Sequence, residues 1–155
     1  MVSGCHVCEA VGHLDHPVLQ TPRWVVDLGS NAAYFGRAYV TLREHKRCLS
    51  ELDDVDWQDL REVVLLLERT YADLFDADPL NWACLMNNAF RDGGDDPHVH
   101  WHVFPRYRTP VEFEGETYRD LHYGEHYDPM AERIMDEAAV ARLAARLKDY
   151  LQHLR

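Results

Sequence analysis

Three histidines alternate with apolar residues in the middle of the chain. They are His98, His100 and His102, and the segment runs on to Pro105. Because successive side chains of a β-strand point to opposite faces, a strand over residues 98–104 would place all three imidazoles on one face. Three imidazoles on one face could bind a metal ion such as zinc, a phosphate group or a proton. A half-exposed strand that carries histidines by chance is the alternative, and the strict register of all three disfavours it.

A Cys-x-x-Cys pair lies near the start of the chain. Cys5 and Cys8 have no second pair of this kind. A redox pair and two unrelated thiols are two readings of the motif. A zinc ion is the third, and it would need two more ligands, for which histidines are the natural supply. His45 and His98 could complete a tetrahedral site, which would be structural because four protein ligands leave no open position.

The other cysteines and early histidines are weaker candidates. Cys48 is close to His45 in sequence and is a rival ligand, whereas Cys84 lies in an apolar segment and is expected to be an inert core thiol. Three further histidines near the start have a spacing that matches no common zinc pattern, and we expect them in solvated loops. They are His6, His13 and His16.

Composition and charge limit the partners. The chain has 155 residues and a formal net charge of −11, from 16 basic and 27 acidic residues. Such a surface repels polyanions, so long DNA or RNA is not expected, although a small phosphorylated ligand stays compatible. No apolar run is long enough to span a membrane, and the first residues do not resemble a signal peptide. We therefore expect a single-domain cytoplasmic protein.

Periodicity predicts strands and one long helix. Strands are expected over residues 24–28, 36–42, 80–86 and 98–104, and residues 32–35 are expected to start another short one. Residues 57–75 have apolar side chains at helical spacing and should be buried against a sheet. His45 directly follows the strand over 36–42, where site residues commonly project, although a surface histidine in a charged turn is the alternative. Asn87 should lie near the histidines, because its strand precedes theirs across a glycine-rich turn.

The end of the chain is predicted to be a flap and a helix. Residues 108–130 are rich in aromatic and charged side chains, with proline and glycine breaks, and are expected to form a loop or flap with a short strand at 111–113. Residues 131–155 return to helical spacing, which predicts a C-terminal helix.

The middle histidine is suited to attack phosphorus. A neutral imidazole can form a bond to phosphorus, and this intermediate divides one displacement into two easier ones. The negative charge on the phosphoryl oxygens must be met by donors, for which backbone N–H groups, the amide of Asn87 and the ring of His102 are candidates.

These residues resemble a known family. The segment from His98 to Phe104 is similar to the signature of the histidine triad (HIT) family, His-φ-His-φ-His-φ-φ, in which φ is apolar. The similarity continues through Pro105-Arg106, as in many bacterial members. Other features occur in the family's order over residues 5–107. They are the Cys-x-x-Cys pair, a strand ending in Asp27, Gly36 leading a strand into His45, a long helix, and an asparagine before a glycine-rich turn.

The resemblance implies a fold and a reaction. The fold would be α+β, a single HIT-like domain over residues 1–155 whose antiparallel sheet carries one long central helix and a C-terminal helix. The activity would be that of a nucleotidyl hydrolase or transferase, in which His100 attacks the α-phosphorus of a nucleoside phosphate conjugate. His102 and Asn87 would lie beside the phosphate, and Asp27 would contact the ribose. Family members are usually homodimers.

The resemblance also implies a metal. In zinc-containing bacterial members, two N-terminal cysteines, a histidine at the position of His45 and the first triad histidine bind zinc. Here these ligands would be Cys5, Cys8, His45 and His98, the set that spacing also allows.

One departure and several alternatives stay open. Many members have polar donors before the triad, whereas this chain has Asp95-Asp96-Pro97. Carboxylates close to a phosphate would oppose its binding unless they face away, are protonated or hold a cation. Dinucleoside polyphosphates are the favoured substrate class, and nucleoside phosphoramidates are the other. A nucleotide-binding module without turnover and a zinc-stabilised interaction protein are the non-enzymatic alternatives.

Overall fold

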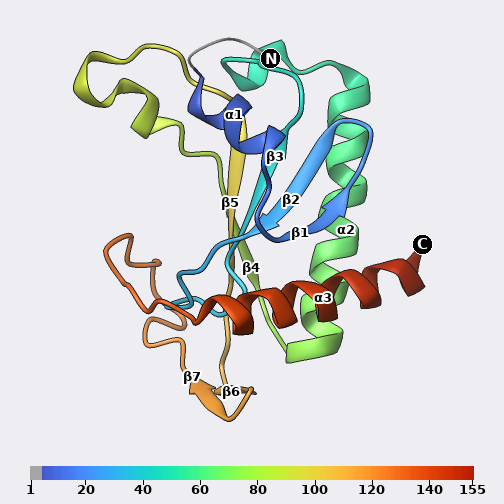
Figure 1. The fold of residues 1–155 in the computed structure, drawn as a ribbon, viewed down its shortest axis with the longest axis vertical. Coiled ribbons are helices and arrows are strands. Elements are labelled where there is room, and N and C mark those ends of the chain that lie inside the picture. The colour runs from blue at the N-terminus through green and yellow to red at the C-terminus, as the bar shows by residue number, and fades with distance from the viewer. Residues whose placement is uncertain (1–4) are drawn as a thin grey trace.

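An antiparallel sheet of five strands forms the centre of the molecule (Figure 1). The structure is a computed structural model that describes residues 5–155, apart from the side chains of residues 92 and 93. Residues 1–4, which the predicted domain includes, lie outside the described residues. The strand order is β1-β2-β3-β5-β4, and a separate hairpin pairs β6 with β7. The strands are β1 (Pro17–Gln20), β2 (Trp24–Leu28), β3 (Ala38–Leu42), β4 (Leu80–Ala83), β5 (His100–Pro105), β6 (Val111–Phe113) and β7 (Glu116–Tyr118).

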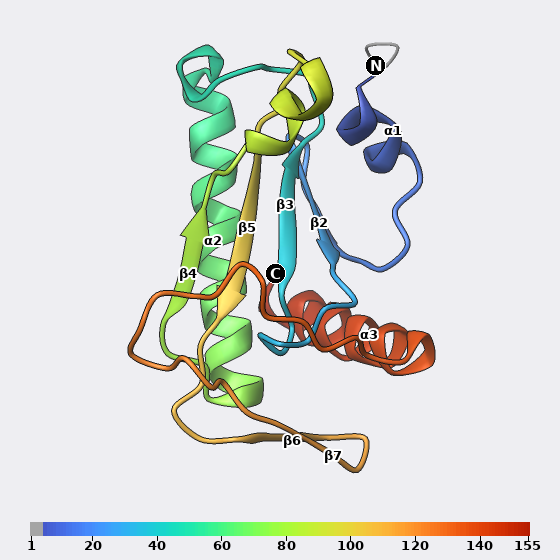
Figure 2. The ribbon, with the colours of Figure 1, turned by 90° about the vertical axis from the view of Figure 1, so that its left-hand side faces the viewer.

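Three α-helices surround the sheet in the described part of the chain. They are α1 (His6–Gly12), α2 (Asp54–Phe75) and α3 (Glu137–Leu154). Helix α2 runs along one face of the sheet, α1 lies on the other side near the upper ends of β2 and β3, and α3 crosses below (Figures 1 and 2). Two 3₁₀ turns, η1 (Leu49–Glu51) and η2 (Asn87–Gly93), complete the fold. Over the described residues, no helix combines the length and the apolar character that a bilayer crossing needs.

Helix α2 is fixed at its start and buried on one side. Asp53 accepts a hydrogen bond from the backbone N–H of Asp56, and the Asp56 carboxylate accepts one in return from the backbone of Asp53, which forms a capping box. The buried side chains that follow include Leu60, Val63 and Leu67, and they join the apolar core under the sheet. The helix therefore forms as the spacing predicts, but it begins three residues earlier, at the caps.

Strand β5 lies between β3 and β4, so both of its edges are paired. Tyr39 is opposite His102, and Thr41 is opposite His100, in the antiparallel register with β3. The next residue of the histidine strand, Val103, is fully buried on the face that α2 covers. The period of two therefore directs the histidines away from α2, as the alternation predicts.

The ends of several predicted elements differ in the structure. The C-terminal helix predicted over residues 131–155 begins at Glu137, because Asp136 caps it by accepting hydrogen bonds from the backbone N–H groups of the next turn. Residues 32–35 form turns instead of a strand, and η2 occupies the place of the predicted glycine-rich turn. Strand β1 and helix α1 were not predicted at all. His13 lies in an exposed bend, as predicted. The His6 side chain is exposed too, but it projects from α1. The His16 side chain, in the loop before β1, is mostly buried and lies 2.9 Å from the Glu137 carboxylate.

The segment after β5 is held by one buried arginine. Arg106 donates hydrogen bonds to the Asp120 carboxylate, with the shorter at 2.6 Å, and both side chains are almost completely buried. It also donates to Asn81 and to the carbonyl oxygens of His122 and Glu125. The predicted flap thus contains the β6–β7 hairpin and a loop that is bound to the sheet. The charge of Arg106 is neutralised by Asp120.

Candidate active site and metal centre

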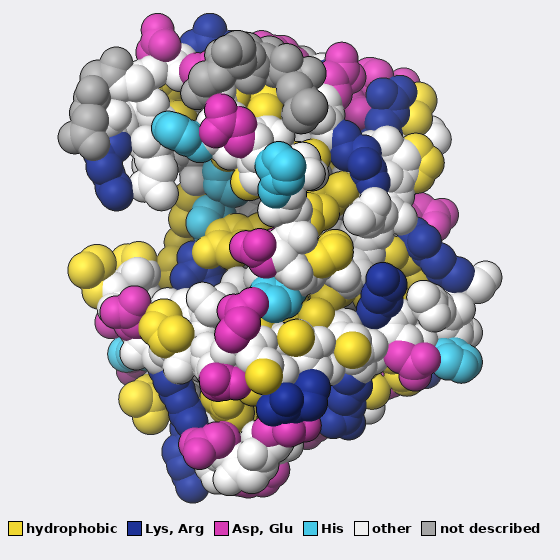
Figure 3. Space-filling model, viewed as in Figure 1, with side chains coloured by type: hydrophobic (Ala, Val, Ile, Leu, Met, Phe, Trp, Pro, Cys, Tyr) yellow, Lys and Arg dark blue, Asp and Glu magenta, His cyan; other side chains and the backbone are white. Residues whose placement is uncertain are grey.

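The histidine series crosses from the buried interior to an open cleft. His98, just before β5, is 1% exposed, whereas His100 and His102 are half-buried. The surface is hollowed beside α1, next to the segment that carries η2, and histidine side chains are visible inside the hollow (Figure 3). The three imidazoles therefore have different surroundings although they share one face.

The metal-ligand set predicted from the sequence is brought together at the upper end of the sheet. One ligand atom from each of Cys5, Cys8, His45 and His98 lies within 4.8 Å of the others. The Nδ1 atom of His98 is 3.6 Å from Sγ of Cys5 and 3.4 Å from Sγ of Cys8. The Nδ1 atom of His45 is also 3.4 Å from Sγ of Cys8. Cys48 lies outside this cluster, with its sulfur 3.1 Å from the Ser50 hydroxyl.

The second nitrogen of each histidine fixes the tautomer that a metal needs. The Nε2–H of His98 donates to the carbonyl oxygen of Leu42 at 2.7 Å. The Nε2–H of His45 donates to the Asp96 carboxylate at 3.1 Å. Each Nδ1 lone pair is therefore directed at the cysteine sulfurs, and partners of this kind orient metal-binding histidines.

The cluster has the dimensions of a zinc site. With Zn–S of about 2.3 Å and Zn–N of about 2.0–2.1 Å, tetrahedral ligands lie roughly 3.3–3.8 Å apart, the range of the sulfur–nitrogen distances above. Two thiols and two imidazoles suit zinc, and burial of all but His45 excludes competing water. Burial also lowers the pKa of His98, which favours the neutral ring that a metal requires. The residues present therefore fit a structural zinc ion.

Asp96 has a role that the sequence did not reveal. Its carboxylate binds His45, so this carboxylate is directed to the metal ligands and not left free beside a phosphate. Arg47 lies 3.9 Å away from the same carboxylate and donates to the backbone carbonyl of Asp95. The acidic stretch before the triad is thus partly neutralised. The Asp96 carboxylate faces away from the phosphate position and is hydrogen-bonded to a candidate metal ligand.

His45 is held in place through its neighbour. The ammonium of Lys46 is 2.5 Å from the fully buried carboxylate of Asp56 at the start of α2. The carbonyl oxygen of Lys46 accepts a hydrogen bond from the backbone N–H of Val99 at 2.9 Å. These two contacts connect the end of β3 to α2 and to β5, and they bring His45 and His98 together.

His100 has the geometry of a nucleophile. Its Nδ1–H donates to the carbonyl oxygen of His98 at 2.8 Å, which leaves the lone pair on Nε2. The ring lines two cavities, of about 390 and 660 Å³, that adjoin around it. A reacting phosphorus atom could therefore be approached by Nε2 with groups of the substrate on both sides.

His102 is set up as a neutral hydrogen-bond donor. Its Nδ1 accepts a hydrogen bond from the Arg37 guanidinium at 3.1 Å, so the proton lies on Nε2. Burial, with His100 and Arg37 nearby, lowers the pKa of His102 to about 4. At neutral pH the ring is uncharged and can donate from Nε2 to an oxygen in the cleft.

The residues predicted to bind nucleotide are not all in the cleft. Asp27 is half-buried and lines the smaller cavity with His100 and His102, and its carboxylate accepts a hydrogen bond from the backbone N–H of His16 at 2.8 Å. Burial raises the pKa of the Asp27 carboxyl group. Asn87 is exposed at the start of η2 and lines neither cavity, whereas its neighbour Asn88 lines both. Strand alternation could not predict which of the two asparagines faces the cleft, because the strand ends at Ala83 and η2 changes the periodicity.

Comparison with known proteins assigns the chain to a family. The HIT domain model matches residues 13–109, more than half of the chain. The chain belongs to the HIT family. The match contains the whole histidine series but begins after Cys5 and Cys8, so the cysteine half of the metal centre lies outside it. No curated protein sequence matches the chain.

Solved structures share the fold at low sequence identity. A hypothetical histidine triad nucleotide-binding protein from Sulfolobus tokodaii has a TM-score of 0.68 at 18% identity, over 97% of this chain and 93% of the other. A zinc-bound histidine triad family protein from Mycobacterium smegmatis has 0.63 at 19%, over 97% and 95%. Diadenosine triphosphate hydrolase from Plasmodium falciparum has 0.62 at 15%, over 90% and 78%. The HIT architecture therefore extends over almost the whole chain.

Proposed function

We propose that the protein is a nucleotidyl hydrolase or transferase that cleaves nucleoside phosphate conjugates at the α-phosphate. The contact that carries this proposal is the hydrogen bond from His100 Nδ1 to the carbonyl oxygen of His98, since it leaves the Nε2 lone pair free at the junction of two cavities. Dinucleoside polyphosphates are the favoured substrates, in line with the hydrolase among the structural neighbours.

The reaction has two displacements. Nε2 of His100 attacks the α-phosphorus, a phosphorus–nitrogen bond forms, and the bond from phosphorus to the leaving group breaks. The positive charge that develops on the ring is stabilised by the Nδ1–H contact with the His98 carbonyl. Water or another acceptor then attacks the phosphorus, a phosphorus–oxygen bond forms, and the phosphorus–nitrogen bond breaks. The acceptor's proton passes to solvent, and the nucleotide and the neutral imidazole are released. His102 donates from Nε2 to a phosphoryl oxygen in both steps.

The remaining assignments have separate supports. Asp27, in the smaller cavity, accepts from the ribose hydroxyl groups, and Asn88 takes the place predicted for Asn87 beside the phosphate. A zinc ion held by Cys5, Cys8, His45 and His98 is structural, because the four protein ligands fill its coordination sphere.

Phosphoramidates are the second substrate class, and one observation favours them. Asp95 lines the larger cavity, and so does Asp96 although one of its oxygens is bound to His45; Arg91 is the sole arginine or lysine among the described lining residues. An acidic cavity suits a leaving group that carries an amine better than one that carries further phosphates. Comparing hydrolysis of a diadenosine polyphosphate with that of an AMP phosphoramidate separates the two classes.

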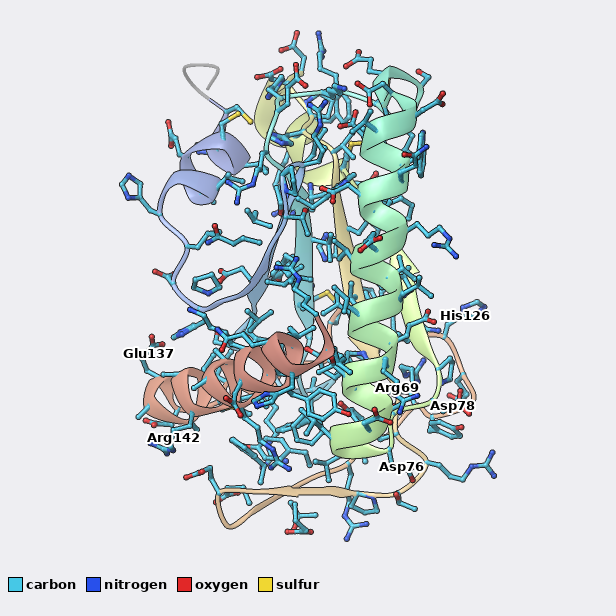
Figure 4. All side chains as sticks on the ribbon, turned by 90° about the vertical axis from the view of Figure 1, so that its right-hand side faces the viewer. Arg69, Asp76, Asp78, His126, Glu137 and Arg142 are labelled. Atoms are coloured by element: carbon cyan, nitrogen blue, oxygen red, sulfur yellow. The ribbon has the colours of Figure 1, made fainter. Side chains whose placement is uncertain are left out.

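Replacement of His100 tests the mechanism. His100→Gln should lower kcat by at least about 10³-fold on substrates of both classes, because the nucleophile is lost. A rapid acid quench of the wild-type protein with labelled substrate should trap nucleotide on the protein, and the variant should trap none. His126→Gln is the matched control, since His126 projects from the loop before α3 at the outer edge of the molecule (Figure 4). Wild-type rates in His100→Gln would contradict the proposal.

The proposal extends to a homodimer in the cytoplasm. We expect the protein to bind neither long nucleic acid nor a membrane, in keeping with its net charge of −11. Light scattering of the purified full chain measures the oligomeric state directly.

A further inference from the structure

Arg37 is half-buried beside the cleft, and the described residues include no carboxylate partner for it. Among the residues that the structure describes, no Asp or Glu forms an ion pair with Arg37, and its buried Nε has no hydrogen-bond partner. The guanidinium carbon lies 4.8 Å from the centre of the Phe104 ring and 5.4 Å from that of Tyr39. A charged group held between aromatic rings keeps an unmet demand for an anion.

The backbone fixes where Arg37 points. Gly36 has φ of 74°, a conformation that favours glycine, and a Cβ there would lie 2.6 Å from the Tyr71 ring. The Tyr71 hydroxyl donates to the carbonyl oxygen of Gly36 at 2.6 Å. The backbone N–H of Arg37 donates to Tyr34, and its carbonyl accepts from Gly29, both at 2.9 Å. The side chain is thus presented to the cleft from a rigid turn.

Charge in the smaller cavity depends on this one residue. Arg37 is the sole arginine or lysine among the described residues that line it, and Asp15 and Asp27 line it too. Without Arg37, the cavity would contain two carboxylates and no arginine or lysine among its described lining residues, and the neutral His102 could not offset their repulsion of a phosphate.

We propose that Arg37 is the phosphate-recognition residue of the cleft: its free N–H groups bind phosphoryl oxygens of the substrate while its Nη2 holds His102 with the Nε2 proton directed at the same phosphate. The inference rests on the proposed function and adds to it a positive group that selects the nucleotide over the nucleoside. Arg37 touches the substrate through its unused donors and acts on His102 as a positioning residue.

Binding measurements on the full chain test the inference. Calorimetric titration with AMP and with adenosine should show that Arg37→Met lowers AMP affinity at least about tenfold, the usual effect of losing hydrogen bonds to a charged group, and changes adenosine affinity less than about twofold. Arg61→Met is the matched control, because Arg61 is exposed on α2, which covers the opposite face of the sheet. Equal AMP affinity in Arg37→Met and the wild type would overturn the inference.

Two further measurements keep the test decisive. Arg37→Lys retains a point charge but not the planar fork, so it should recover part of the AMP affinity; full wild-type affinity for AMP in this variant would overturn the need for a guanidinium. Nitrogen-15 NMR of the His102 ring should show the Nε2–H tautomer in the wild type and a mixture in Arg37→Met, a change that loss of packing alone would not produce. An unchanged tautomer would remove the positioning role.

Failure of the inference is distinguishable from failure of the proposed function. If the wild type binds AMP through Arg37 but forms no nucleotidyl-His100, the catalytic proposal is wrong and the role of Arg37 is supported. If turnover passes through His100 and Arg37→Met binds AMP normally, the catalytic proposal stands and the inference is wrong.

Discussion

The two ends of one histidine series differ in how many ring nitrogens are occupied. At the buried end, both nitrogens of His98 have partners, the cysteine sulfurs and a backbone carbonyl. At the open end, His100 and His102 each use only Nδ1, as donor in one ring and as acceptor in the other. Three residues of one type in one alternating series are thus suited to the three proposed roles of metal ligand, nucleophile and hydrogen-bond donor, because their Nδ1 partners differ.

The contrast also concerns charge. Burial raises the pKa of the Cys5 thiol, so a thiolate at the buried end needs a cation beside it. The open end needs its rings neutral and its positive charge on Arg37. A change at one end should therefore have a different signature from a change at the other, and three substitutions test this difference.

The largest effect is expected from Cys8→Ser. Loss of a ligand should release the metal and remove several kcal/mol of stabilisation, which for a chain of this length lowers the melting temperature by on the order of 10 °C. Elemental analysis and calorimetry measure both quantities. Cys48→Ser is the control, since Cys48 lies outside the cluster. His100→Gln, at the open end, should retain the metal. If Cys8→Ser contained as much metal as the wild type, the proposed difference between the two ends would be wrong.

A smaller effect is expected from Asp96→Asn. The amide can still accept a hydrogen bond from His45 but lacks the charge that raises the basicity of the ring, so zinc affinity should fall by about 10–100-fold in a chelator competition. Asp95→Asn, at the exposed neighbour, should leave it unchanged. If both variants bind zinc equally, Asp96 has no part in the metal centre.

The smallest effect is a pH dependence at the open end. The folded pKa of His102 is about 4, below the ordinary 6.5, so the unfolded chain takes up a proton that the folded chain does not. This residue therefore costs stability as pH falls from 6.5 towards 4, and not above. His100 and Arg37 are the groups that disfavour its charge, and Tyr39 packs against its ring.

Substitution of His102 isolates its contribution to the pH dependence of stability. Between pH 7 and 5, His102→Gln should reduce the loss of unfolding free energy by on the order of 1 kcal/mol, after allowance for solvent access to a half-buried ring. Urea denaturation at several pH values measures this. Parallel curves for variant and wild type would show that the ring is protonated as easily in the folded chain as in the unfolded one.

The sequence predicts what depends on regular spacing. The histidine strand, its pairing with β4 and the long helix follow from periods of two and 3.6, and the ligand set follows from residue types with strong metal preferences. Helix α1 has only seven residues and no apolar stripe of useful length, so periodicity could not find it. Strand β1 has four residues and depends on its pairing with β2.

Site residues that act through tertiary contacts were also beyond the sequence. Arg37 gave a weak signal, since it alternates with Tyr39 and Thr41 on the histidine side of β3. Nothing local distinguishes Asp96 from Asp95, because the partner of Asp96 is 51 residues away. The same holds for Asn88 and Asn87, which differ only in how η2 turns them.

Helix α1 connects the two ends that were compared above. A helix of seven residues is not stable by itself in water, so its position depends on what holds it. Cys5 and Cys8 attach it to the candidate metal centre, while Val7 and Val11 line the smaller cavity. Ordering this helix once would serve both proposed ligands, so zinc and nucleotide would share one conformational cost. If zinc and nucleotide bind as proposed, thermodynamic reciprocity requires that each raises the affinity for the other by the same factor.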